Sequence, residues 1–552
     1  MTGVATAPEV ATVLDRADAP SGGRQSMTGT ARLTRFVLRR DRVRILLWFT
    51  AIVGLIVVTA ASITGLYDTP EQLESYARTV RGNSALIVQA GPGYGLDEPT
   101  TGAVMMNEVS VWTIIAVGLM SVFMVVRHTR TEEESDRAEL VRAAPVGRDA
   151  SLASAMIGTA IADAVVAAGA ALALIAYGLP TTGSVAFGLA VFGAGLVFAG
   201  VAAVTSQVAS GSRAALGLGG VAIGVAFVLR AIGDVGNGVL SWFSPIGWAQ
   251  SIRAFADERW WVLLLPALAT AALVAVVVVL QGRRDFGAGL MAQRPGAAAA
   301  GPRLSSALGL AVRLQRASVV SWAIGIGLIA FFYGIVADQA ESILEDNPEM
   351  EDFFVELGRG SIVDAFLSTA ALMIGLMATG FTISSVLRLR SEEVGGRVDA
   401  LLATPVSRRA VARSHLVVAA AGTVIVMTVA GFAVGLGYAL VVGDAGEVSR
   451  NTAAGLVMVP AMLVFGAMAF ALYALSPRWS PLVWALFTWA LVAGMLASVL
   501  DLPDWTLDLS PFQHVPALPA APMSWLPIVV LLLVTGALVW VGMWALDRRD
   551  MS

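Results

Sequence analysis

Long apolar stretches constrain the fold of this chain more than any other feature of its sequence. A helix needs about 20 consecutive, mainly apolar residues to cross a hydrocarbon core of about 30 Å. Twelve stretches of the 552 residues meet this condition. They cover approximately residues 45–66, 105–126, 150–178, 184–206, 214–232, 260–280, 319–336, 362–387, 410–442, 452–475, 482–500 and 525–546. The sequence therefore predicts an all-α polytopic membrane protein, because each helix satisfies its own backbone hydrogen bonds in lipid.

The composition excludes several classes of function. Only 14% of the residues are charged, against about 25% in globular chains, which excludes a soluble enzyme. All 36 basic residues are arginine, so the chain carries neither a phosphate-binding G-x-x-x-x-G-K-[ST] loop nor a Schiff-base lysine. There is no cysteine, and His128, His415 and His514 lie far apart in the sequence, so no metal site is predicted. A net charge of −4 over this length does not indicate a nucleic-acid partner.

Charge in the loops predicts the orientation. Residues 1–29 are polar and lack the apolar core of a signal peptide, so we expect a disordered cytoplasmic tail. Arginines gather on one side of the spans, for example Arg40 before the first and Arg130 after the second. The loop between the seventh and eighth spans instead carries eight carboxylates between residues 338 and 356. Because basic loops stay in the cytoplasm, we expect a multi-pass protein of the plasma membrane with both termini cytoplasmic.

The chain contains an internal repeat. Residues 130–148 align without a gap to residues 390–408, and 8 of the 19 positions are identical. Ser244-Pro245 recurs as Ser510-Pro511 at a similar offset. An even number of spans in each half gives both halves the same orientation, so the sequence predicts two parallel six-helix repeats. The expected divisions are a first half at 30–285, a cytoplasmic linker at 286–304 and a second half at 305–552.

Each copy of the repeated stretch is predicted to form a short cytoplasmic helix. Thr131 and Ser391 are candidate N-caps, glutamates fill the expected first turn, and a proline ends each helix. Glu133 with Arg137, and Glu393 with Arg397, have the spacing of i,i+4 ion pairs. A single charged loop is usually a solvated face, whereas duplication favours a mechanical element between two spans. The candidate residues are Glu132, Glu133, Arg137, Glu139, Pro145 and Arg148 in the first copy and Glu392, Glu393, Arg397, Asp399, Pro405 and Arg408 in the second.

Residues 391–408 carry acidic residues, then a glycine pair, an acid, Leu-Leu and finally Ala-Thr-Pro-Val-Ser-Arg. This pattern resembles the cytoplasmic coupling-helix segment of type-2 permeases of ATP-binding-cassette (ABC) exporters. The whole chain is similar to the fused twelve-span permeases of actinobacterial antibiotic exporters of the tetronasin (polyether) and multidrug type. The first copy departs from the pattern, with Ser135-Asp136 in place of Gly395-Gly396.

The resemblance implies that two copies of a separate ATPase subunit dock on the coupling helices and bind ATP and Mg²⁺, so the chain is not an enzyme by itself. It also implies a basic amphipathic helix before the first span of each half, for which Leu33, Phe36 and Val37, and then Leu310 and Leu314, are candidates. Finally, it implies short re-entrant helices on the outer side, at 234–259 and 501–524.

The resemblance further implies a drug cavity lined by spans 1, 2, 5, 7, 8 and 11. Aromatic and methionine side chains suit varied apolar ligands because they repack. The candidates are Trp112, Met120, Phe123, Met124, Phe366, Met373, Met377 and Phe381. We hypothesise that Phe123, Met377 and Phe381 form a cluster that contacts a hydrophobic substrate.

Few charged residues enter the spans. Asp163 lies near the middle of span 3 and is either a packed, hydrogen-bonded carboxyl or a proton or cation site. Glu108, Arg230 and Asp364 lie near span ends, where we expect them at the membrane interface.

The leading prediction is an ATP-driven exporter that moves hydrophobic or amphipathic compounds, such as antibiotics or other drugs, out across the plasma membrane. The alternative is an ion-coupled secondary transporter of twelve spans. That alternative gives the duplicated acidic loop no role and lacks a relay of intramembrane carboxylates.

Overall fold

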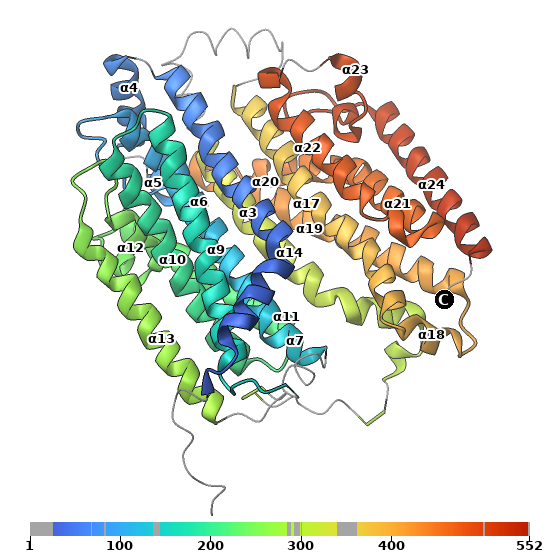
Figure 1. Ribbon diagram of the computed structural model, residues 1–552. Coiled ribbons are helices and arrows are strands. Elements are labelled where there is room, and N and C mark those ends of the chain that lie inside the picture. The colour runs from blue at the N-terminus through green and yellow to red at the C-terminus, as the bar shows by residue number, and fades with distance from the viewer. Residues whose placement is uncertain are drawn as a thin grey trace, which may run out of the picture. The chain divides into compact units, whose positions relative to one another are not determined.

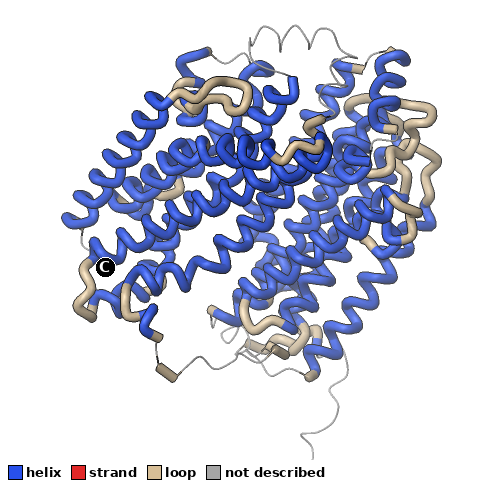
Figure 2. Tube along the Cα trace, turned by 180° about the vertical axis from the view of Figure 1, so that it is seen from behind, coloured by secondary structure: helices blue, strands red, loops and turns tan. Residues whose placement is uncertain are grey.

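The computed structural model describes residues 26–67, 69–81, 84–135, 144–283, 289–291, 298–299, 301–338, 362–500 and 503–549. In these residues the chain forms helices and connecting loops and no strand (Figure 2). Eleven helices among them are long and apolar enough to cross a membrane. The helix α22 (Leu482–Leu500) occupies the position of the remaining predicted span. The predicted all-α polytopic class is confirmed.

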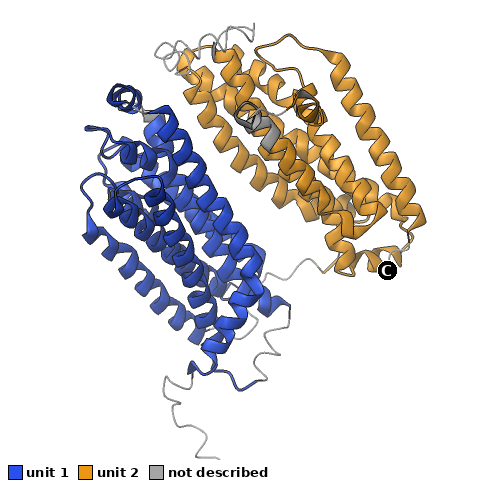
Figure 3. Cartoon of the chain, turned by 45° about the horizontal axis from the view of Figure 1, so that its top comes forward, with its two compact units in different colours: residues 1–295 blue, residues 296–552 orange. Residues whose placement is uncertain are grey.

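The chain divides into two compact units, residues 1–295 and 296–552 (Figure 3). The division falls inside the segment predicted as the linker. The long helices of the first unit are α3 (Thr30–Leu66), α6 (Thr101–His128), α9 (Ala150–Ala176), α10 (Thr181–Val208), α11 (Ser212–Val235) and α13 (Leu264–Gly282). Those of the second unit are α14 (Ala307–Val336), α17 (Ile362–Val394), α19 (Arg408–Val442), α20 (Gly446–Val457), α21 (Val459–Leu475), α22 and α24 (Trp525–Arg548).

The two units use the same scheme of helix packing. In the first unit α9 packs against α3 and α10, and α10 packs against α6 and α13. In the second unit α19 packs against α14 and α20, and α21 packs against α17 and α24. This correspondence extends the repeat seen in the loops to the arrangement of the spans.

Small residues permit close contact between the helices. A Cβ placed on Gly118 of α6 would lie 2.7 Å from the Phe198 ring of α10. One placed on Gly188 of α10 would lie 2.8 Å from the Ala167 carbonyl oxygen of α9. Without water to drive association, membrane helices depend on such close packing, which explains the glycine-rich and alanine-rich spans.

In each unit the basic segment expected as an amphipathic helix before the first span is part of the first long helix. The basic segments are the first turns of α3 and α14 and continue without a break into the spans. Val37 is buried, and its side chain would lie 2.8 Å from a Cβ placed on Gly158 of α9. The segment remains helical because it packs on α9. The span predicted at 452–475 is divided into α20 and α21 at Met458, since Pro460 at the start of α21 cannot donate a helical hydrogen bond.

Short helices fill the connections. In the first unit, α4 (Pro70–Val80) and α5 (Ser84–Ala90) lie at the end opposite α7 (Arg130–Glu134) (Figure 1). The predicted re-entrant segments contain short helices in both units. These are η1 (Leu240–Phe243) and α12 (Pro245–Ser251), followed by η2 (Trp260–Leu263), and in the second unit α23 (Asp504–Leu507) and η5 (Pro511–His514). Ser244 and Ser510 occupy the N-cap positions of α12 and η5, which accounts for the repeated Ser-Pro pair. The remaining short elements are η3 (Pro302–Leu304), α18 (Arg397–Leu402) and η4 (Pro477–Trp479).

Candidate functional site

The first copy of the repeated loop begins with α7, immediately after α6. Glu132 and Glu133 lie in its first turn, as predicted. Thr131 lies inside α7 and is not its cap, because Thr129 occupies the N-cap position. Arg137 and Glu139 lie outside the described residues, so the predicted pair of Glu133 with Arg137 stays a prediction.

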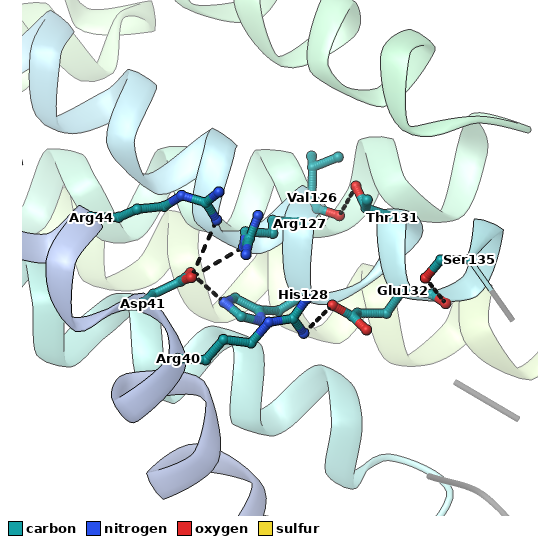
Figure 4. A network of polar contacts seen from close by, with 9 residues as sticks. All are labelled: Arg40, Asp41, Arg44, Val126, Arg127, His128, Thr131, Glu132 and Ser135. Atoms are coloured by element: carbon teal, nitrogen blue, oxygen red, sulfur yellow. Dashed lines mark hydrogen bonds and ion pairs between the residues drawn. The ribbon is translucent and has the colours of Figure 1, made fainter. Parts of the chain in front are cut away.

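A buried carboxylate anchors the start of this loop to α3 (Figure 4). Asp41 of α3 is fully buried. It accepts hydrogen bonds from Arg127 Nε at 3.1 Å and from His128 Nε2 at 2.6 Å, both at the end of α6. Arg40, next to Asp41, pairs with Glu132 of α7. Because both partners of each contact are largely enclosed, α6 and α7 are held firmly against α3.

The same loop is also tied to the beginning of α11. The buried Arg130 donates from one terminal nitrogen to Glu133 Oε2 at 2.8 Å and from the other to the Ser210 carbonyl oxygen at 2.6 Å. Glu134 accepts from the backbone N–H of Ser212 at 2.7 Å, at the first residue of α11. A carboxylate is favoured there by the helix dipole. α7 thus bridges α3 and α11, and a force on it acts on three spans.

The second copy has a different local structure from the prediction. α17 continues to Val394, so Ser391, Glu392 and Glu393 lie in its last turn, and Ser391 is not an N-cap. The helix continues because no residue before Gly395 interrupts it. Gly396, with φ of +67°, occupies the N-cap position of α18, where glycine adopts the left-handed conformation without strain. α18 carries Asp399 in its first turn and ends before Pro405.

The predicted pair of Glu393 with Arg397 is wrong. Arg397 pairs instead with Glu392, which also accepts from Arg388 Nε at 2.8 Å. The neighbouring Glu392 carboxylate raises the pKa of Arg397 above its ordinary value. The reason for the change is the turn at Gly395 and Gly396, which ends α17 and breaks the i,i+4 register.

Glu393 instead links the loop to two distant helices. It accepts hydrogen bonds from the Tyr473 hydroxyl of α21 and from Arg549, just after α24. Arg549 also donates to the Tyr473 carbonyl oxygen at 2.8 Å. Arg408, at the start of α19, donates to the Arg549 carbonyl oxygen at 3.0 Å. α17, α19, α21 and α24 therefore meet at one cluster beside α18.

Both copies leave a surface exposed beyond these anchors. Val398 of α18 is buried, whereas Asp399 and Pro405 are exposed and Val394 is 77% exposed. In the first copy Pro145 and Arg148 are exposed, and Arg148 lies 3.7 Å from Asp149. An exposed surface on an anchored support is the arrangement that a docking partner requires.

Comparison with known proteins assigns the chain to a family. The family model described as "Multidrug efflux system permease Rv1217c, C-terminal domain" matches residues 304–546. The chain is 39% identical to the multidrug efflux system permease protein Rv1217c of Mycobacterium tuberculosis (strain ATCC 25618 / H37Rv) over 549 residues, which are 98% of this chain and 99% of that relative. The chain belongs to this family of multidrug efflux permeases. The assignment does not favour the ion-coupled alternative.

The side chains predicted to line a substrate cavity of the permease differ in exposure. Phe381 is fully buried and packs against Trp322, with ring centroids 6.2 Å apart, so it lies in the core of its own unit. Phe123 and Met377 are 48% and 41% exposed and can contact a ligand. Trp112 is also exposed, Met120 and Met124 are core residues, and Phe366 and Met373 are partly buried.

The charged residues in the spans of the permease are paired or enclosed. Asp163 is fully buried and accepts a hydrogen bond from the Ser121 hydroxyl at 2.9 Å. Arg230, which is expected near the membrane interface, is fully buried and donates to the carbonyl oxygens of Ile87 and Val88 at 3.1 and 2.7 Å. Glu108 accepts from Tyr76, and Asp364 accepts from Arg450. Within the described residues no group of His, Asp or Glu side chains is placed to hold a metal ion.

Sequence reasoning missed the two anchors of the repeated loops. Asp41 lies four residues after the buried Val37 and so shares its helix face. This spacing could have identified Asp41 as the one acid among the arginines that faces inward. No local pattern connects Glu393 to Arg549, which lies 156 residues further along the chain.

Proposed function

We propose that the permease is the membrane subunit of an ATP-driven exporter. Two copies of a separate ATPase subunit dock on its repeated loops and bind the ATP and Mg²⁺ that supply the energy. The permease itself carries out no chemistry and moves hydrophobic or amphipathic compounds out across the plasma membrane. Both of its termini lie in the cytoplasm, on the side of the loops.

The observation that carries this proposal is the anchoring of an exposed surface to several spans in each unit. In the second unit Val394 at the end of α17 and Asp399 of α18 are exposed, while Glu393 is held to α21 and α24. In the first unit α7 is held to α3 and α11. When ATP closes the two ATPase subunits, the displacement of each loop moves several spans as a group, which is how rigid-body transitions are transmitted.

The substrate proposal rests on the exposed, adaptable side chains of α6 and α17. Trp112, Phe123 and Met377 present apolar area that the core of each unit leaves uncovered. Aromatic and methionine side chains accept ligands of varied shape because they repack at little cost. The relative in Mycobacterium tuberculosis is named as a multidrug efflux permease, which agrees with such a surface.

Docking can be tested by reversing one exposed charge on α18. The permease would be co-expressed with the ATPase encoded by a neighbouring gene and purified through a tag on the ATPase. We expect Asp399→Arg to reduce co-purification, because the substituted side chain faces the partner. Asp508→Arg is the matched control, since Asp508 is exposed between α23 and η5, in a loop outside the repeated stretch. Equal recovery of the two variants would contradict docking on α18.

A further inference from the structure

A pocket opens in the first unit at the end opposite α7. The space inside it that a water molecule can reach is about 30 Å³. Early residues of α6 contribute Asn107 and Ser110, and α10 contributes Phe187. Tyr94, Gln250 and Arg253 come from the segments that connect the long helices. The pocket has room only for a small polar group, and it combines an apolar wall with a few polar groups, as ligand sites do.

Arg253 brings a positive charge into this pocket without a carboxylate partner. No described acid lies within ion-pair distance of its guanidinium, which instead lies 4.5 Å from the centroid of the Tyr94 ring. Its Nε is enclosed and has no hydrogen-bond acceptor. Of the two acids in the same loop, Glu258 accepts from the backbone N–H of Phe255 at 3.3 Å and Asp257 is exposed. A partly buried cation without a counter-charge is costly, and a bound anion would remove that cost.

Gln250, which lines the same pocket, adds an unsatisfied acceptor. Its Nε2 donates to the Ala90 carbonyl oxygen at 2.8 Å and to the Ser110 hydroxyl at 3.1 Å. These acceptors fix which end of the amide carries the protons. The opposite atom, Oε1, is enclosed and has no partner. Buried polar atoms are nearly always satisfied, so two unsatisfied atoms on side chains that line one pocket mark a place where a polar group can bind.

The loop that presents Arg253 is held in a strained conformation. Arg253, Phe255 and Asp257 have φ of +56°, +65° and +55°, a region that side chains other than glycine rarely adopt. The Phe255 ring fixes the loop, because it fits against Gly102 of α6 and Gly183 of α10, where a Cβ would collide with it. Strain of this kind persists where the surrounding structure enforces it, and it is concentrated at functional sites.

We propose that this pocket binds an anionic oxygen headgroup, a carboxylate or a phosphate ester, through the guanidinium of Arg253. Where the headgroup carries an O–H, as a singly protonated phosphate ester does, that O–H donates to Gln250 Oε1. Only the headgroup enters the pocket, and the adjoining carbon chain extends out of it. The inference concerns binding to the first unit and does not depend on coupling to an ATPase.

The test is ligand-induced thermal stabilisation of the purified full chain in maltoside micelles. The probes are hexyl phosphate and hexanoate, with hexanol as the uncharged control. We expect both anions to raise the melting temperature and hexanol to have little effect. Arg253→Gln should weaken the apparent affinity for the anions at least tenfold, because charged hydrogen bonds carry the recognition. Arg259→Gln removes the same charge from the same loop and should leave the affinity unchanged.

Three results would overturn the proposal: equal affinity in the Arg253→Gln and Arg259→Gln variants, equal stabilisation by hexanol, or no stabilisation by any probe. If Arg253→Gln is itself unfolded, Gln250→Glu replaces it in the test, since a carboxylate in the pocket must repel the anions. Unchanged anion affinity in Gln250→Glu would then overturn the proposal.

A final comparison identifies the natural source of the headgroup. Weaker hexanoate binding in nanodiscs that contain phosphatidylglycerol than in pure phosphatidylcholine assigns the pocket to a lipid headgroup, and equal binding assigns it to a free acid or phosphate ester.

Discussion

Replacing Arg549 by Gln should separate the second repeated loop from the spans it is proposed to move. Arg549 joins Glu393 of α17 to Tyr473 of α21, through hydrogen bonds to the Glu393 carboxylate and to the Tyr473 carbonyl oxygen. The side chains of Arg549 and Glu393 are only 14% and 12% exposed. Solvent therefore screens their interaction weakly.

The magnitude follows from these contacts. Removing one partner of an enclosed charged pair costs about 3–5 kcal/mol. The remaining exposure of both side chains places the expected loss at or below the lower end of this range, at about 2–3 kcal/mol, since water can solvate the abandoned carboxylate. A loss of about 2 kcal/mol shifts the equilibrium between the anchored and released loop by about 30-fold.

The assay compares ATPase binding with drug-stimulated ATP hydrolysis in nanodiscs. Arg549→Gln should keep the ATPase bound, because the exposed face of α18 is unchanged, but should largely abolish stimulation by drug. Arg409→Gln is the control, because it breaks a pair with Asp547 at the end of the same helix α24, where Arg409 is solvent-exposed. Exposed pairs contribute little. Equal stimulation in the two variants would refute the idea that this cluster transmits movement.

Three further predictions concern packing, the first anchor and the substrate. Gly195→Ala should destabilise the permease by about 1–3 kcal/mol in a thermal unfolding assay, because the new Cβ would lie 2.7 Å from the Asp163 carboxyl carbon. Gly220→Ala, where no atom lies within 4 Å, should leave the melting temperature almost unchanged, and an equal loss would contradict this reading of the core. Asp41→Asn should lower stability by about 3 kcal/mol in the same assay, since Arg127 loses its buried counter-charge and His128 loses its carboxylate partner; an unchanged melting temperature would show that this network does not stabilise the permease. Phe123→Ala should raise the drug concentration needed for half-maximal ATPase stimulation without a change in melting temperature, and an unchanged drug response would remove Phe123 from the substrate surface.

The class of fold followed from the sequence because membrane insertion imposes a simple rule of length and polarity. Twelve apolar stretches and one repeated loop were sufficient to predict the polytopic class and the repeat, and both units show the same helix packing. The division of one span at Met458 shows the limit of that rule, since hydropathy does not register the missing N–H of Pro460.

The details of the site were harder to predict because they depend on contacts between distant segments. Local spacing suggested that Glu393 pairs with Arg397. Because the chain turns at Gly395 and Gly396, Arg397 instead forms an ion pair with Glu392, and Glu393 forms one with Arg549. The positions of aromatic and methionine residues in the sequence did not predict burial either, because they placed the buried Phe381 and the exposed Met377 in the same predicted cluster. Helical periodicity identifies a face, but only packing decides what covers that face.

The central claim, that α18 is a docking surface for an ATPase, can be tested by site-directed cross-linking. The chain has no cysteine, so Asp399→Cys and Asp508→Cys each provide one site for a benzophenone label. We predict that the label at position 399 cross-links to the co-expressed ATPase on illumination and that the label at position 508 does not. Absence of a cross-link from position 399, or equal cross-linking from both positions, would contradict the account.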